Sequence, residues 1–295
     1  MGHASSKKNG EFNKENKKKF DKDHKRINKN LTKEYEKNKD YLTISVIDVH
    51  RFIEGRRFHI SKDLTYTFPS DNQEASRFNE SIKHMKRLFN SNYSAPVEKL
   101  LTHGAKVLEI GTGGGFWLAD MSKTYPMSTF LGIDLSTMFH QTFDYVFQQS
   151  ISSSKFRNNQ FDTHLREIFR VVKPGGWIEI FGSPTELINA GPASKKFIKS
   201  IRNCFQFNGL DPYLVYTYPN KLRSLNIKNV QVAEMQYYLS NHNKSLENQE
   251  SRLLLSTAES LRVMLKMVEG YTEEEYDAIL RDMAIELETL NMSMK

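Results

Sequence analysis

The sequence predicts an α/β fold in which helices cover both faces of a mostly parallel, doubly wound sheet. Three observations predict this fold. The apolar run 107–110 ends at a glycine, as a buried strand does, and further glycines follow at 113, 114 and 115. Residues 116–122 then have a helical pattern, and a second apolar run, 130–133, ends at Asp134. A strand, a glycine-rich turn, a helix and a second strand in this order are typical of parallel α/β proteins.

The glycine-rich turn is predicted to form a binding site for a polar ligand. Glycine lets the backbone approach a ligand closely, and the helix that follows offers unpaired N–H groups. The carboxylate of Asp134, at the tip of the second strand, can accept two hydrogen bonds from ribose hydroxyls. The dinucleotide fingerprint G-x-G-x-x-G needs glycine at position 116, where this chain has Phe116, so the spacing argues against a dinucleotide.

Glu109, Gly111, Gly113 and Gly115 follow the pattern E-x-G-x-G-x-G, and in this pattern the sequence resembles the class I S-adenosylmethionine-dependent methyltransferases. The resemblance implies a Rossmann-like fold with S-adenosylmethionine as the cofactor. In that family the acidic position lies near the methionine end of the cofactor, the glycines bound the pocket, and the acid after the second strand holds the ribose. The predicted cofactor-binding residues are therefore Glu109, Gly111, Thr112, Gly113, Gly115, Asp134, Leu135 and Gln148. The alternative is a structural glycine turn in an unrelated α/β protein.

The resemblance extends over roughly residues 50–290. Residues 161–181 look like the family's helix, turn and fifth strand, and residues 55–59 and 66–78 look like the lead-in of the fungal regulators of secondary metabolism. The implied organisation is a disordered basic tail at 1–40 and a methyltransferase domain at 41–295. Within that domain we expect a cofactor-binding core at 100–182 and a helical lid with a sixth strand at 183–295.

The first elements of the domain lie upstream of the glycine-rich turn. Residues 42–49 fit an added strand or a buried helix turn, and both interpretations stay open. Residues 75–89 carry four apolar side chains at helical spacing that we expect in the core, namely Phe78, Ile82, Met85 and Phe89. A further helix, predicted at 94–102 with Pro96 near its start, leads into the first strand of the core.

The connection after Asp134 is too short for an ordinary crossover. Only residues 135–141 precede the next strand candidate, 143–147, whereas a parallel crossover normally needs about 10–12 residues. Seven extended residues span at most about 25 Å. The resemblance implies a third strand and an acidic loop at this place, and the chain has no counterpart of either, so no residue is assigned to the adenine. We therefore expect an incomplete sheet, at a loss of several kcal/mol at about 1.5–3 kcal/mol per buried apolar side chain.

Downstream of the crossover the pattern alternates helices and strands. A helix at 161–172 is stopped by the turn 173–176, a strand follows at 177–181, and a helix at 195–207 places Cys204 in the core. A sixth strand is predicted at 230–235, then helices at 246–268 and 272–290, the second opening with Thr272 and Glu275 in a capping box. The last strand that the resemblance implies, beside the fifth, is expected to be absent or vestigial.

Charge and cysteine content restrict the partners and the compartment. Residues 1–40 hold thirteen basic and seven acidic side chains, a net charge of +6 out of +7 for the whole chain, so the folded part is nearly neutral. This balance argues against a nucleic-acid platform in the folded part. Cys204 is the only cysteine and there is no apolar run of about 20 residues, which together suggest a cytoplasmic protein in a reducing compartment. A nuclear location is the alternative, and the oligomeric state is left open.

The first residues admit two interpretations. Gly2 and Ser6 match M-G-x-x-x-[ST], the pattern for N-myristoylation, and lysines follow in a polar tract. A myristoyl chain together with a polybasic patch can hold a protein at an anionic membrane surface. The alternative is a solvated, disordered tail that begins Met-Gly by chance.

Methyl transfer needs an acceptor in line with the S–CH3 bond, exclusion of water and, for a protonated acceptor, a base. By position alone the candidates are Gln148, Gln149, Ser183 and Glu186 at strand ends, with Tyr66 and Arg77 in the lead-in. A structural or solvated role is the stronger interpretation of each, so the catalytic residue is unassigned. The strand tip FQQS differs from Asn-Pro-Pro-Tyr, which argues against methylation of DNA bases or protein glutamine. The nine histidines have no metal-site spacing.

Two functional hypotheses follow. The first is a methyltransferase that acts on a small-molecule or protein acceptor. The second is a degenerate methyltransferase-like domain that serves as a tethered interaction module. The intact glycine-rich pattern with Asp134 favours the first hypothesis, and the short crossover and missing last strand favour the second. A nucleic-acid binder rests on the basic tail alone.

Overall fold

The structure is a computed structural model that describes residues 50–59, 66–134, 142–149, 158–183, 186–225, 227–239 and 248–294. Several expectations lie outside these residues: the basic tail with Gly2, the candidate strand 42–49, and the crossover 135–141 with Leu135. Everything below concerns the described part of the chain.

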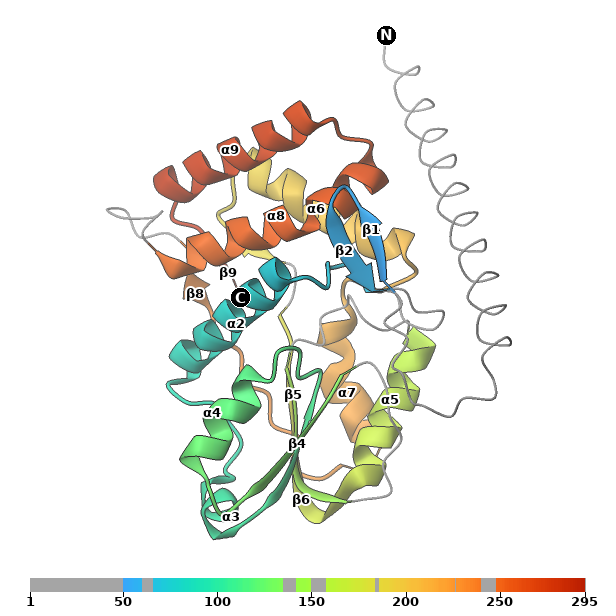
Figure 1. The fold of residues 1–295 in the computed structure, drawn as a ribbon, viewed down its shortest axis with the longest axis vertical. Helices are drawn as coiled ribbons and strands as arrows, with labels where there is room; N and C mark the ends of the chain where they lie inside the picture. The colour runs from blue at the N-terminus through green and yellow to red at the C-terminus, as the bar shows by residue number, and fades with distance from the viewer. Residues whose placement is uncertain are drawn as a thin grey trace.

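A four-stranded parallel sheet forms the centre of the lower half of Figure 1. Its strand order is β4-β3-β5-β6. The strands are β3 (Lys106–Ile110), β4 (Thr129–Ile133), β5 (Phe143–Gln149) and β6 (Val172–Phe181). The sheet confirms the predicted fold class and the strands at 107–110, 130–133, 143–147 and 177–181. The order places β4 and β5 on opposite sides of β3.

Helices cover both faces of this sheet, as expected for parallel strands that are buried on both sides. One face packs against α2 (Asn72–Phe89), α3 (Glu98–His103) and α4 (Phe116–Thr124). There the indole of Trp117 stacks on the ring of Phe147, with ring centres 4.3 Å apart. The other face packs against α5 (Asn158–Val171), α7 (Tyr218–Ser224) and the short 3-10 helix η1 (Leu214–Thr217). The predicted core residues Ile82 and Met85 of α2 are buried.

A second layer of helices lies beyond the carboxyl ends of the strands, in the upper half of Figure 1. It consists of α6 (Pro192–Phe207), α8 (Gln249–Glu269) and α9 (Glu273–Thr289), whose apolar faces form one core cluster. Cys204 is buried in this cluster, as predicted, and Thr272 and Glu275 form the predicted capping box of α9. The hairpin of β1 (His50–Ile53) and β2 (Arg56–His59) packs on the same cluster through Phe58.

The prediction of a sixth strand at 230–235 is wrong. Residues 229–236 have no strand, and the side chains at 231–234 are exposed. The alternating apolar pattern is present, but a strand also needs a neighbour at backbone-pairing distance, and within the described residues β6 is the edge of the sheet. The nearest strand is β8 (Tyr237–Tyr238), which joins a separate small sheet in the order β7-β9-β8 with β7 (Leu187–Ile188) and β9 (Ser293–Met294).

The last strand of the described residues, β9, is two residues long. The two residues of β9 pair antiparallel with β7 and β8 and do not lie beside β6. The β6 edge is therefore unpaired within the described part of the chain, and a cavity lies along it.

Two helices of this layer, α6 and α9, are joined by a buried carboxylate. Glu286 of α9 accepts hydrogen bonds from the backbone N–H groups of Ala193 and Ser194, at 2.7 and 2.8 Å, in the first turn of α6. The N-cap of α6, Gly191, has no side chain to do this, and a Cβ at that position would lie 2.2 Å from the Glu286 carboxyl carbon. Glu286 thus acts as the cap of a helix that belongs to another part of the chain.

We expect Glu286→Ala to lower the free energy of unfolding by about 2–3 kcal/mol, because two buried N–H groups lose a charged acceptor. Chemical denaturation measures the change. Glu288→Ala, an exposed position on the same helix, is the matched control and should change stability by less than about 0.5 kcal/mol. Equal stabilities of the two variants would contradict the proposed cap.

Candidate active site

The turn between β3 and α4 has the backbone conformation that its glycines predict. Gly111, Gly113 and Gly115 have φ angles of +79°, +50° and +72°, a region that side-chain-bearing residues rarely adopt. The N–H groups of Gly111 and Thr112 both donate to the carbonyl oxygen of Ile133, at 2.8 and 3.1 Å. The turn is therefore tied to the carboxyl end of β4.

Glu109 lies at the carboxyl end of β3 with no exposed surface. Its Oε2 accepts a 2.7 Å hydrogen bond from the Thr112 hydroxyl, and its Oε1 is buried without a partner among the described residues. Burial raises the pKa of Glu109 to about 7; the Thr112 hydrogen bond opposes this rise and the charge of Asp134 adds to it. A buried carboxylate with an unused oxygen is suited to receive a cationic N–H donor.

Asp134 follows β4 and faces the same turn. Its Oδ2 accepts a 2.7 Å hydrogen bond from the N–H of Gly113, and the residue is exposed. Gly115, the N-cap of α4, offers no side-chain cap, so the N–H groups of the first turn of α4 stay open to a ligand. The structure thus brings together Glu109, Thr112, Asp134 and the three glycines of the predicted cofactor site.

The two glutamines at the end of β5 point to opposite faces of the sheet. Gln148 lies on the α5 face, where its Oε1 is 2.8 Å from Nε2 of His164. Gln149 lies on the face of Glu109, because Phe147 pairs with Glu109 and side chains alternate along a strand. Its Oε1 is buried and has no partner within the described residues. Gln148 stays a prediction as a cofactor contact, and Gln149 is the glutamine that shares the face of the site.

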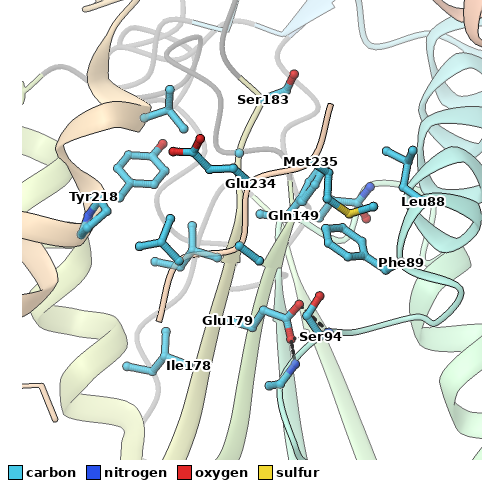
Figure 2. Close-up of a pocket in the computed structure, with 18 of the residues that line it drawn as sticks. Leu88, Phe89, Ser94, Gln149, Ile178, Glu179, Ser183, Tyr218, Glu234 and Met235 are labelled. Atoms are coloured by element: carbon cyan, nitrogen blue, oxygen red, sulfur yellow. Dashed lines mark hydrogen bonds between the residues drawn. The ribbon is translucent and has the colours of Figure 1, made fainter. Parts of the chain in front are cut away.

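A cavity of about 1540 Å³ lies beside the site, because Phe78, whose ring lies against Gly113 of the turn, is part of its lining. Figure 2 shows Tyr218 of α7 on one side of it, Leu88 and Phe89 of α2 on the other, and Gln149 between them. The lining is mainly apolar, and it includes every residue of β6. Glu179 of β6 is held at one wall, where its carboxylate accepts hydrogen bonds from the backbone N–H groups of residues 94 and 95.

The surroundings of the remaining candidate catalytic residues fit structural or solvated roles. Arg77 forms a two-point ion pair with Glu74, at 2.6 and 2.9 Å. Tyr66 is half-buried in the cavity wall, and its partial removal from water raises its pKa. Glu186 accepts a 2.6 Å hydrogen bond from the hydroxyl of Tyr216. Ser183 is exposed at the top of β6, as Figure 2 shows.

No helix in the described part of the chain is long and apolar enough to span a membrane. No group of three histidine, cysteine, aspartate or glutamate side chains there could hold a metal ion.

Comparisons with known proteins place these features beside methyltransferases. Methyltransferase pytC of Aspergillus terreus is 24% identical over 160 residues, which cover 46% of this chain and 47% of the relative. The same protein from strain NIH 2624 gives the same values. This similarity confirms the expected resemblance to methyltransferases. The chain spans about half the length of the curated relatives it matches, and no protein-family profile matches it.

Two of the solved structures that match this chain are those of methyltransferases. Phosphoethanolamine N-methyltransferase 2 of Haemonchus contortus, in complex with S-adenosyl-L-methionine, has 14% identity and a TM-score of 0.37, and the match covers 73% of this chain and 50% of that one. A SAM-dependent methyltransferase of Geobacter sulfurreducens, in complex with S-adenosyl-L-homocysteine, has 13% identity and a TM-score of 0.32, with 78% and 90% covered.

The buried Glu109 predicts a pH-dependent cost in stability. Its pKa is about 7 in the folded protein and near 4.5 when exposed, so the folded state binds the proton more tightly and loses stability as pH rises from about 4.5 to 7. We expect Glu109→Gln to be more stable than the parent chain at pH 8 by about 3 kcal/mol, and similar to it at pH 4.5. Denaturant unfolding at both pH values measures this, with Glu288→Gln as an exposed control. A stability gain that is equal at both pH values would contradict the assignment.

Proposed function

We propose that this chain is an S-adenosylmethionine-dependent methyltransferase whose cofactor lies in the β3–α4 turn and whose acceptor lies in the adjoining cavity. The observation that carries the proposal is the pair of acidic side chains, Glu109 and Asp134, at the ends of adjacent parallel strands on either side of the glycine turn. The similarity to Methyltransferase pytC supports the same class of reaction.

The residues of the turn fit this cofactor. The unpartnered, buried Oε1 of Glu109 matches an ammonium group, which a methionine end carries. Asp134 is exposed at the neighbouring strand end, where a carboxylate can accept from ribose hydroxyls. A Cβ at Gly113 would lie 3.0 Å from the ring of Phe78, so the wall of the turn leaves no space for a side chain there.

When bound, S-adenosylmethionine supplies a methyl group on a sulfonium sulfur, which an electron-rich atom of the acceptor can take. The chain's own residues have two tasks in this reaction. Glu109 and Asp134 hold the methionine end and the ribose of the cofactor, so that its position relative to the cavity is defined. The apolar lining of the cavity keeps water from the reacting atoms. Gln149, on the face of Glu109 and in the cavity wall, lies where the two sites adjoin.

Calorimetric titration of the full chain with S-adenosylhomocysteine tests the cofactor site. We expect micromolar binding, and at least a tenfold loss in Asp134→Ala, because the loss of even one good hydrogen bond to a charged acceptor costs about 1.5 kcal/mol or more. Asp282→Ala, an exposed position on α9, is the control and should bind as the parent chain does. Absence of binding by a chain that unfolds cooperatively would reject the proposal and leave the interaction-module hypothesis.

The same titration should depend on pH. An ammonium group beside Glu109 favours the ionised carboxylate. Binding therefore lowers the pKa of Glu109 from about 7, its value in the folded protein without ligand. We expect the affinity to rise with pH up to about 7 and then to level off, with a proton released to the buffer on binding below that pH. Titrations in two buffers of different ionisation enthalpy measure the released proton. Release that persists in Glu109→Gln would assign the proton to another group.

A further inference from the structure

Two buried hydrogen-bond acceptors interrupt the mainly apolar wall of the cavity. The first is Oε1 of Gln149, a residue that is 1% exposed. The second is Nε2 of His84, in the middle of α2, a residue that is 6% exposed. Neither atom has a hydrogen-bond partner among the described residues. A buried polar atom left without a partner lowers stability, so each atom is an incomplete contact that a ligand can complete.

The surroundings of His84 determine which hydrogen its ring carries. Its Nδ1 lies 3.2 Å from Oε1 of Glu250, the second residue of α8. A carboxylate accepts hydrogen bonds, so Nδ1 holds the hydrogen of the neutral ring and Nε2 presents a lone pair. Burial lowers the pKa of His84 and the Arg87 guanidinium lowers it further, although Glu250 opposes both. The ring of Tyr237 meets the imidazole edge-on, with ring centres 4.5 Å apart.

The cavity wall therefore presents two acceptors that have no donor, and the wall around them is mainly apolar. Aromatic side chains contribute much of its wall, among them Phe68, Phe89, Trp177, Phe181 and Tyr237. Flat rings pack well against such walls. The ligand that completes this cavity has a planar apolar body and carries a hydroxyl or N–H group toward each of the two acceptors.

We propose that the cavity binds the methyl acceptor, and that this acceptor is a planar, largely apolar small molecule with donor groups that bind Gln149 Oε1 and His84 Nε2. That this ligand is the methyl acceptor rests on the proposed function. The chemical class of the ligand is inferred from the cavity wall and does not depend on the proposed function. The volume, about 1540 Å³, exceeds the roughly 300–1,000 Å³ of sites for drug-sized ligands. A single protein side chain would leave most of it empty, so a multi-ring molecule fits better than a protein acceptor.

Three fluorescent naphthalenes test the two acceptors with the full chain, with and without S-adenosylhomocysteine. The probes are 2,6-dihydroxynaphthalene, its monomethyl ether and its dimethyl ether, which share a planar apolar body and carry two, one and no donors. We expect the diol to bind the parent chain about tenfold more tightly than the monomethyl ether, and that ether about tenfold more tightly than the dimethyl ether. Equal binding of the three probes would overturn the proposal without any variant.

Variants then assign the acceptors. Gln149→Leu and His84→Phe keep the size of each side chain and remove the acceptor, so each should weaken the diol about tenfold and leave the dimethyl ether unchanged. Gln206→Leu and His103→Phe, at exposed positions, are the matched controls. An effect of only one of the two variants would overturn the assignment of two acceptors.

A third variant covers the case in which His84→Phe fails to fold. In Glu250→Lys the ammonium can only donate, so Nδ1 becomes the acceptor, the ring hydrogen moves to Nε2 and the acceptor becomes a donor. The preference for the diol over the monomethyl ether should then fall about tenfold, and an unchanged preference would overturn the role of His84. The outcomes separate the two proposals. Probe binding without cofactor binding rejects the methyltransferase, and cofactor binding with equal affinity for the three probes rejects the acceptor site.

Discussion

Two hydrogen bonds continue the pairing of β3 and β4 beyond the end of β3, from the N–H groups of Gly111 and Thr112 to the carbonyl oxygen of Ile133. They hold the first residues of the turn against the neighbouring strand, so the turn cannot move independently of the sheet. The Thr112 hydroxyl is thereby placed on Glu109, and the residue after Ile133, Asp134, closes on the turn from the other side. The geometry of the candidate cofactor site depends on this extension of a parallel ladder.

The same region carries costs that a purely structural core avoids. Glu109 is buried with one oxygen unpaired, and Gln149 and His84 each leave a buried acceptor without a partner within the described residues. Cores of proteins pair nearly all such atoms, because each unpaired one lowers stability. A binding site without its ligand contains acceptors that the ligand would pair, and these unpaired acceptors lie at a glycine turn and along one cavity. The stability they cost is consistent with contacts kept for a ligand.

Particular residues show how far sequence patterns reach. The core strands, α4 and the capping box of Thr272 follow from local preferences, and they agree with the structure. The strand predicted at 230–235 has the right alternation but no neighbour to pair with, because pairing depends on residues far away in the chain. At the end of β5 the sequence analysis names Gln148, and not Gln149, as a cofactor-binding residue. The register, which pairs Phe147 with Glu109, places Gln149 on the side of the site.

The sequence by itself determined the parallel α/β core and the glycine turn. Both depend on signals that lie within a few residues of each other, namely runs of β-branched and aromatic residues, glycines with positive φ and an acidic residue at a strand end. Only the tertiary structure decided the cavity and its two acceptors. His84 and Glu250 are 166 residues apart, and the tautomer that leaves Nε2 as an acceptor exists only because α2 packs against α8. Which buried atom lacks a partner is a property of the packed molecule, since it depends on every element that surrounds that atom.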